Sequence, residues 1–373
     1  MAGLFCGGCG GRYSLDELLW KCTCGSVLDI EFKASFPLEE IEGRAPNLWR
    51  YRESIPLAAD GNIISMGEGL TPMIEEDLDG VPVWLKLEYM FPTGSFKDRG
   101  ASVLVSKMKE LGVKEAIEDS SGNAGCALAA YCAKARIDCH IFVPDGAPVE
   151  KVTQIGMYGA KVEKIFGDRE AVAMAALKAA ERGYYASHSW NPFFLQGTKT
   201  IAFEICEQLH WSAPDTLILP IGNGTLLLGA HRGFKDLLAG GIIERMPRLI
   251  GVQAEACSPL FQMFRGGLDE IPAITGGDTI ADGIAIAQPI RGRQIVRAIL
   301  ESKGDILSVG EPQIRDSLEM MGRIGHYIEP TSAVAVAGAR MYLKRAPSGE
   351  RVVIPLTGTG LKATGKIMDL GVG

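Results

Sequence analysis

Hydrophobic positions along the chain form short apolar runs that alternate with segments of helical spacing. Apolar runs at 83–87, 139–143, 217–221, 249–254 and 352–356, together with the short segment 116–119, predict short buried strands. Helical spacing predicts helices over 101–111, 124–135 and 171–182, and another that ends near Leu238. Short apolar strands alternating with helices favour parallel sheets covered by helices on both faces. From Trp49 onward the chain is therefore predicted to be an α/β protein.

Such sheets bind ligands beyond the carboxyl ends of their strands, so the loops after the strands are the places to look for chemistry. The loop PTGSFKDRG (92–100) puts Lys97 among hydroxyl groups at the start of a predicted helix. A helix N-terminus disfavours a protonated lysine, and a neutral lysine attacks carbonyl groups to form a Schiff base. A lone lysine in such a turn is usually a surface residue, so this interpretation depends on the other loops.

A second loop, SSGNAG (120–125), gathers hydroxyl groups, an amide and backbone N–H groups at another predicted helix start. That combination predicts a site for a carboxylate, with Asn123 as an additional donor. The alternative is an ordinary helix start capped by serine.

The loop GNGT (222–225) follows a buried strand, and its glycines let backbone N–H groups surround a phosphate. It lacks the Gly-Lys-Ser/Thr element of nucleotide-binding loops, which argues against a nucleoside triphosphate. The last loop, TGTGLKA (357–363), matches a dinucleotide fingerprint, but only ten residues follow Ala363, too few for the rest of that unit. The hydroxyl of Thr357 is instead suited to meet a pyridine nitrogen.

Length and composition narrow the class of protein. A chain of 373 residues with 47% hydrophobic and 22% charged residues is typical of a globular enzyme of two or three domains. The net charge of −7 argues against nucleic-acid binding. No apolar run is long enough to span a bilayer and the first residues do not resemble a signal peptide, so we expect a cytoplasmic protein without a membrane partner.

Four of the nine cysteines lie close to the N-terminus, as a C-x-x-C (Cys6, Cys9) and a C-x-C (Cys22, Cys24). Four thiolates at this spacing predict a structural zinc site in a small ribbon. The alternative is a ribbon remnant that has lost its metal. The others are scattered among apolar residues and are expected to be buried thiols: Cys126, Cys132, Cys139, Cys206 and Cys257.

Taken together, the four loops and the cysteine-bearing start resemble the fold-type II pyridoxal 5′-phosphate (PLP) enzymes, most closely the threonine synthase family. The motifs occur in family order over nearly the whole chain, with Glu329-Pro-Thr-Ser332 as a partner of the terminal loop. The resemblance implies a Schiff base between Lys97 and PLP, with the same lysine moving protons during the reaction. It implies substrate-carboxylate binding by Ser120 and Ser121. For the cofactor it implies contacts from Asn123, Gly222, Asn223, Gly224, Thr225 and Thr357.

The resemblance also implies an architecture like that of the tryptophan synthase β chain: two open, mostly parallel twisted sheets with flanking helices. We expect a Cys-rich ribbon at 1–32, a large PLP-binding domain made of 33–90 and 200–373, and a small substrate-binding domain at 91–199 that carries Lys97. A homodimer is expected by analogy.

Departures from the family pattern fall in the region expected to bind the substrate phosphate. Phe194 stands where an Arg is usual, and Phe cannot replace a bidentate phosphate donor. Ala124 and Thr359 replace a usual Thr and His, and His188 lies in a region where Asn is common. The segment TIADGIA (279–285) is closer to dehydratase relatives. Arg99, Lys199 and His188 are candidates for a different phosphate site.

The expected reaction is elimination, or elimination with replacement, on a small amino acid bound to PLP. The family favours threonine synthase, which converts O-phosphohomoserine to threonine and phosphate. The altered phosphate region favours a threonine/serine dehydratase or a diamino-acid ammonia-lyase, which release a 2-oxo acid and ammonia. Two readings from other classes are an NAD-dependent oxidoreductase that uses Gly358 and Gly360, and a non-catalytic zinc-ribbon binding protein.

Overall fold

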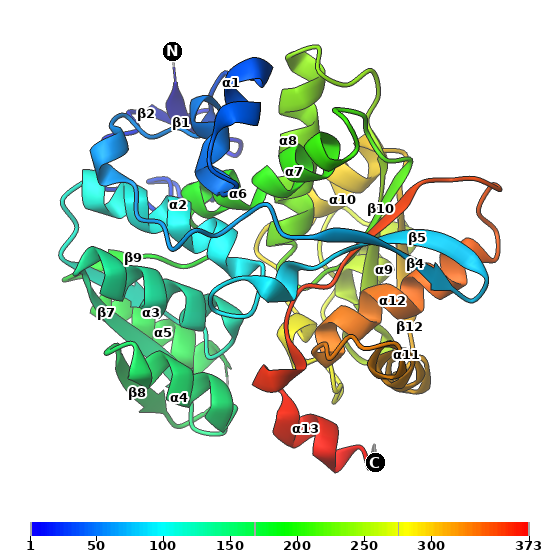
Figure 1. Ribbon diagram of the computed structural model, residues 1–373. Coiled ribbons are helices and arrows are strands. Elements are labelled where there is room, and N and C mark those ends of the chain that lie inside the picture. Colours follow the sequence, from blue (N-terminus) through cyan, green and yellow to red (C-terminus); the bar gives the residue numbers. More distant parts are fainter. Residues whose placement is uncertain (1, 168, 275, 372–373) are drawn as a thin grey trace. The chain divides into compact units, whose positions relative to one another are not determined.

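A computed structural model describes residues 2–167, 169–274 and 276–371 (Figure 1). The chain divides into two compact units: unit 1 is Met1–Gly69 with Lys97–Thr200, and unit 2 is Leu70–Phe96 with Ile201–Gly373. The sequence-based division differs, because it placed residues 33–69 with the larger part. They belong to unit 1 because Leu48, Trp49, Ile55 and Leu57 share an apolar cluster with Val103.

Unit 1 contains a four-stranded parallel sheet in the order β8-β7-β6-β9. The strands are β6 (Glu115–Glu118), β7 (Asp138–Pro144), β8 (Lys161–Ile165) and β9 (Tyr184–Tyr185). Its helices are α2 (Lys97–Glu110), α3 (Asn123–Ala135), α4 (Val149–Met157), α5 (Arg169–Ala179) and α6 (Pro192–Thr198). Side chains alternate across the sheet, so Ala116 and Ile141 join the cluster of α2 and α3, while Ile117 and Phe142 pack with α5.

The N-terminal part of unit 1 is the predicted Cys-rich ribbon. Its antiparallel strands β1 (Gly3–Cys6), β2 (Arg12–Tyr13) and β3 (Leu28–Glu31) run in the order β2-β1-β3. Short helical segments follow: α1 (Leu38–Gly43), η1 (Leu48–Ser54) and η2 (Asp60–Asn62).

Unit 2 contains a six-stranded sheet in the order β12-β11-β10-β13-β5-β4, parallel except for β4 at one edge. The strands are β4 (Met73–Leu78), β5 (Val81–Lys86), β10 (Thr216–Pro220), β11 (Arg248–Ala254), β12 (Asp305–Val309) and β13 (Val352–Pro355). Helices α11 (Glu311–Arg323) and α12 (Pro330–Leu343) pack on one face, where they share an apolar cluster with Ile218, Ile250 and Val252.

The other helical segments of unit 2 are short or connect strands. They are η3 (Glu88–Met90), α7 (Thr200–Gln208, which starts at the boundary), α8 (Thr225–Ala239), η4 (Glu255–Cys257), α9 (Pro259–Gly266), η5 (Asp282–Ile284), α10 (Gly292–Glu301), η6 (Gly360–Lys362) and α13 (Thr364–Asp369). Among the described helices, none combines the length and the apolar content needed to cross a bilayer.

The two mostly parallel sheets confirm the predicted fold class, and each predicted strand is present within about two residues of its expected bounds. The helix expected to start at 101 starts at Lys97 instead, which places the predicted reactive lysine in its first turn. All five scattered cysteines are buried, as predicted.

Candidate functional site

In unit 2, two of the predicted loops leave neighbouring parallel strands at the same sheet edge. The 222–225 loop follows β10 and leads into α8, and Thr357 follows β13, which pairs with β10. Because parallel neighbours end at one edge, the topology itself brings these two loops to one place.

The 222–225 loop has the backbone of an anion site. Gly224 is the N-cap of α8 in the left-handed conformation (φ 69°), and it makes no side-chain capping bond. The first N–H groups of a helix have no partner within the helix, and its dipole favours negative charge there. At Gly222 a Cβ would come within 2.8 Å of the Ile284 Cα, so the close approach of these backbones requires glycine. The loop is therefore suited to a phosphate.

Thr357 is buried and is fixed by a small network. Its Oγ1 lies 3.0 Å from Ser332 Oγ, which accepts a hydrogen bond from the Gly358 N–H (3.0 Å). The structure thus joins the two C-terminal motifs that the sequence placed 25 residues apart. The Thr357 carbonyl accepts the Phe96 N–H (3.0 Å), and Phe96 directly precedes Lys97 in the chain. Within the described residues, the buried hydroxyl of Ser95 has no hydrogen-bond partner.

In unit 1, the 120–122 loop follows β6 and leads into α3, whose N-cap is Gly122 and makes no side-chain capping bond. Ser120 Oγ accepts the Gly122 N–H (3.3 Å), and Ser121 and Asn123 are half-buried. A helix start capped by serine is therefore not what forms here. The helix terminus, two hydroxyl groups and one amide are groups of the kind that bind a carboxylate.

A buried carboxyl–imidazole pair adjoins this loop, and sequence reasoning missed its carboxyl partner. Glu118 ends β6, and its Oε1 lies 2.9 Å from His188 Nδ1, while its Oε2 accepts the His188 N–H (3.2 Å). His188 follows β9, which pairs with β6, so both come from one sheet edge. Burial raises the pKa of Glu118 well above its usual range and the charge of Asp119 adds to this, whereas the His188 N–H and the Lys97 charge oppose it.

Phe194 lies beside both His188 and Lys97. Its ring centroid is 5.8 Å from that of His188 and 5.7 Å from Lys97 Nζ. The ring also packs on α2, because a Cβ at Gly100 would come within 2.4 Å of it. The residue that the sequence marked as a lost phosphate ligand is therefore a buried aromatic side chain beside Lys97.

The two other candidate cations for a phosphate site each have a partner in unit 1. Arg99 is fully buried and donates from its guanidinium to Thr200 Oγ1 (3.0 Å). Lys199 Nζ lies 5.6 Å from the ring of Phe32, which follows the ribbon.

The four N-terminal cysteines converge. The sulfur atoms of Cys6, Cys9, Cys22 and Cys24 all lie within 4.8 Å of one another. Cys6 and Cys24 are 3.6 Å apart, and Cys9 and Cys22 are 3.5 Å apart. Tetrahedral zinc with Zn–S bonds of about 2.3 Å requires sulfur separations of about 3.8 Å, so the donor set fits this metal.

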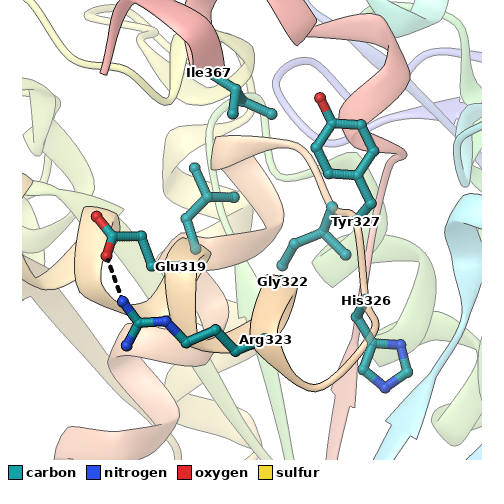
Figure 2. Close-up of a pocket in the computed structure, with 8 residues that line it drawn as sticks. Glu319, Gly322, Arg323, His326, Tyr327 and Ile367 are labelled. Atoms are coloured by element: carbon teal, nitrogen blue, oxygen red, sulfur yellow. Dashed lines mark hydrogen bonds and ion pairs between the residues drawn. The ribbon is translucent and has the colours of Figure 1, made fainter. Parts of the chain in front are cut away.

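Figure 2 shows a separate pocket of unit 2, of about 210 Å³, between the end of α11 and α13. Arg323 reaches toward Glu319 (3.3 Å), and Ile367 lies on the opposite side of the pocket. His326 faces Tyr89 and Glu76 (3.2 and 3.6 Å). These polar groups already have partners, and the pocket includes none of the predicted site residues.

Comparisons with known proteins identify the family. A family model described as pyridoxal-phosphate dependent enzyme matches residues 64–358. A threonine synthase of Methanocaldococcus jannaschii is 36% identical over 369 residues, which cover 95% of this chain and 91% of the relative. A threonine synthase of Methanosarcina acetivorans is 34% identical over 381 residues, which cover 98% of this chain and 94% of the relative.

Solved structures share the fold at lower identity. Maize serine racemase superimposes with a TM-score of 0.71 at 23% identity and covers 88% of this chain and 98% of its own. The processed form of threonine deaminase isoform 2 from Solanum lycopersicum superimposes with a TM-score of 0.70 at 22% identity. The match covers 95% of this chain and 95% of the other chain. The fold and the loops define a fold-type II PLP-dependent α/β enzyme, a lyase. The chain belongs to the threonine synthase family of these enzymes.

Proposed function

We propose that the protein is a threonine synthase that converts O-phosphohomoserine and water to threonine and phosphate, with PLP bound through Lys97. The observation that carries the proposal is the position of Lys97 as the first residue of α2, in the same unit as the 120–123 loop. Relatives named threonine synthase align with nearly the whole chain.

The residues present fit PLP. The 222–225 loop supplies backbone N–H groups and Thr225 at a helix N-terminus for the cofactor phosphate. Asn123 would donate to the ring oxygen, and the neutral hydroxyl of Thr357 would meet the pyridine nitrogen. Bound PLP supplies an electron sink next to the substrate α-carbon.

The remaining chemistry belongs to side chains of unit 1. Ser120 and Ser121 hold the substrate carboxylate through hydroxyl groups at the start of α3. The Lys97 amine removes the proton from the substrate α-carbon and returns protons to the carbon skeleton. Its place at a helix N-terminus favours the neutral amine that this role needs.

A second candidate function follows from Phe194. Its buried ring offers no hydrogen-bond donor where the family uses a guanidinium, and a phosphate bound there would lose a bidentate contact. The alternative is a threonine or serine dehydratase, or a diamino-acid ammonia-lyase, which has no phosphate to bind.

The deciding experiment follows inorganic phosphate and threonine from O-phospho-L-homoserine, beside 2-oxo acid from L-threonine and L-serine. Phosphate and threonine in equal amounts support the proposal, and 2-oxo acid without phosphate release supports the alternative. Lys97→Arg should abolish whichever activity the wild type shows. It should also abolish the covalent link to PLP that borohydride reduction fixes. The exposed Lys134→Arg should retain both and serves as the matched control.

We also propose that the protein is a cytoplasmic homodimer and that the cysteine ribbon holds one structural zinc ion per chain. The sulfur separations support the zinc site. Metal analysis of purified protein should give one zinc per chain, Cys24→Ser should lose it, and Cys257→Ala should retain it. Protein without zinc under chelator-free conditions would refute the assignment.

A further inference from the structure

We propose that His188 binds the leaving group of the substrate and gives it a proton, and that Glu118 positions His188 and replaces that proton. The inference deepens the proposed function, on which it rests, by assigning the site of the departing phosphate. It concerns residues of unit 1 alone.

The pair is fixed by two contacts. Glu118 accepts the His188 backbone N–H and meets Nδ1 at 2.9 Å, which sets both the position of the loop and the orientation of the ring. Both side chains are more than nine-tenths buried. With Nδ1 held by Glu118, proton exchange with a ligand takes place at Nε2.

The location matches that of a leaving group. Glu118 lies two residues before Ser120, the first residue of the 120–122 loop, so the imidazole and this loop come from one edge of the sheet. Phe194 lies within 6 Å of both His188 and Lys97. A substrate with its carboxylate at Ser120 and its α-carbon at Lys97 therefore extends its side chain into the surroundings of Phe194 and His188.

Two neighbouring cations of unit 1, Arg99 and Lys199, have contacts of their own. Lys97 and Gly100 are three residues apart on α2, a spacing that places them on one helix face, and Phe194 packs on Gly100. Arg99 binds Thr200, and Lys199 lies at the ring of Phe32.

The surroundings keep a proton on the pair. Burial raises the pKa of Glu118, and the charge of Asp119 adds to the effect, while Lys97 opposes it. Cys139 and Tyr185, from β7 and β9, also interact with this carboxyl group. The apolar wall of Phe194 lowers the local dielectric, which strengthens each hydrogen bond to a ligand.

The proton balance closes within the pair. As the Cγ–O bond breaks, its electron pair goes to the bridging oxygen of the phosphate, which takes the Nε2 proton of His188. Nδ1 takes the carboxyl proton of Glu118 in the same movement, which leaves a neutral imidazole and a carboxylate. The water that adds at Cβ later releases one proton, and this restores Glu118.

The test uses holoenzyme and three variants. His188→Asn should lower kcat for O-phospho-L-homoserine by at least about 100-fold, the usual contribution of a general acid. It should also raise the inhibition constant of inorganic phosphate by about 10-fold or more, because one hydrogen bond to a charged ligand is lost. Binding of L-2-aminobutyrate, which has no leaving group, should stay within twofold.

Glu118→Gln should lower kcat by at least about 10-fold and leave phosphate inhibition within twofold, because the amide positions the ring but supplies no proton. His140→Asn is the matched control: His140 is a second buried histidine of unit 1, 2.9 Å from Glu163. Its kinetic constants should equal those of the wild type.

The outcomes separate the inference from the proposed function. If the wild type releases phosphate and His188→Asn behaves like His140→Asn, the inference is wrong and the function stands. If the wild type releases no phosphate, the proposed function is wrong. Binding of inorganic phosphate to the wild type and to His188→Asn then tests the inference. Loss of that binding in His188→Asn supports an oxyanion site, and absence of binding in the wild type refutes it.

Discussion

Replacing Gly100 with alanine tests the packing that places Phe194. A Cβ at this position would lie 2.4 Å from Cε1 and Cζ of the Phe194 ring, far inside van der Waals contact. The ring is 1% exposed. Helices α2 and α6 meet at backbone contact here, because a Cβ at Gly197 would lie 2.0 Å from the Arg99 carbonyl oxygen. The collision must therefore move the ring or separate the helices.

The expected cost comes from overpacking. Forcing a methyl group into a well-packed core costs about 1–3 kcal/mol, and this site falls at the upper end because both helices approach at backbone contact. The usual gain of about 0.5–1 kcal/mol from Gly to Ala in a helix offsets part of this cost. We expect Gly100→Ala to lower the free energy of unfolding by about 2 kcal/mol, measured in urea with the cofactor present.

Two variants make the measurement specific. Gly156 is also helical, in α4, and a Cβ there meets nothing within 4 Å, so Gly156→Ala should raise stability by about 0.5–1 kcal/mol. Phe194→Leu relieves the collision, so the double variant with Gly100→Ala should lose less than the two single losses added together, with a coupling of at least about 0.5 kcal/mol. If Gly100→Ala is as stable as Gly156→Ala, or if the two changes are additive, the packing described here is wrong.

Three further variants probe other parts of the structure. Lys86→Met should cost about 3–5 kcal/mol in urea unfolding, because it leaves the fully buried Glu204 carboxylate, now 2.9 Å from the Lys86 amine, without its counter-ion; a near-neutral change would contradict this. Burial lowers the pKa of His231 to about 4, so the wild type should lose up to about 3 kcal/mol of stability as pH falls from 6.5 to 4. Thermal unfolding of His231→Gln across that range should show a smaller loss, and equal losses would contradict the assignment. Gly358→Ala puts a Cβ 2.3 Å from the Glu329 carboxylate and should cost about 1–3 kcal/mol; an unchanged thermal midpoint would show that the loop has room.

The strands were predictable because burial on both faces leaves a local signal, an unbroken apolar run such as 217–221 or 249–254. The edge strand β4 gave no such signal. It reads MIEEDL, is partly exposed, and is a strand because it pairs with β5. Local sequence cannot report a pairing that tertiary contacts create.

The start of α2 was misjudged for a related reason. Residues 97–100 read Lys-Asp-Arg-Gly and carry neither apolar periodicity nor a good helix former at Gly100. The helix extends to Lys97 because α6 packs closely on this turn, with Gly197 against the Arg99 carbonyl and Phe194 against Gly100. Gly100 therefore has two effects: it weakens the helix signal in the sequence, and it permits the close contact with Phe194.

The candidate site was also predictable only in part. The loops that hold anions could be predicted, because they follow parallel strands and topology alone brings such loops together. The Glu118–His188 contact could not be predicted, because it joins residues 70 positions apart and nothing local marks Glu118 as the partner of a histidine. Only the pairing of β6 with β9 makes the two side chains neighbours.

The exchange of a guanidinium for Phe194 therefore changes more than one contact. A guanidinium is always charged and would bind phosphate without supplying a proton. The aromatic ring instead lies beside the buried Glu118–His188 pair, where hydrogen bonds are stronger than in water. A site built in this way gains most with leaving groups that need a proton to depart. It follows that a threonine synthase can lack the guanidinium that binds the substrate phosphate if His188 instead gives the departing phosphate a proton.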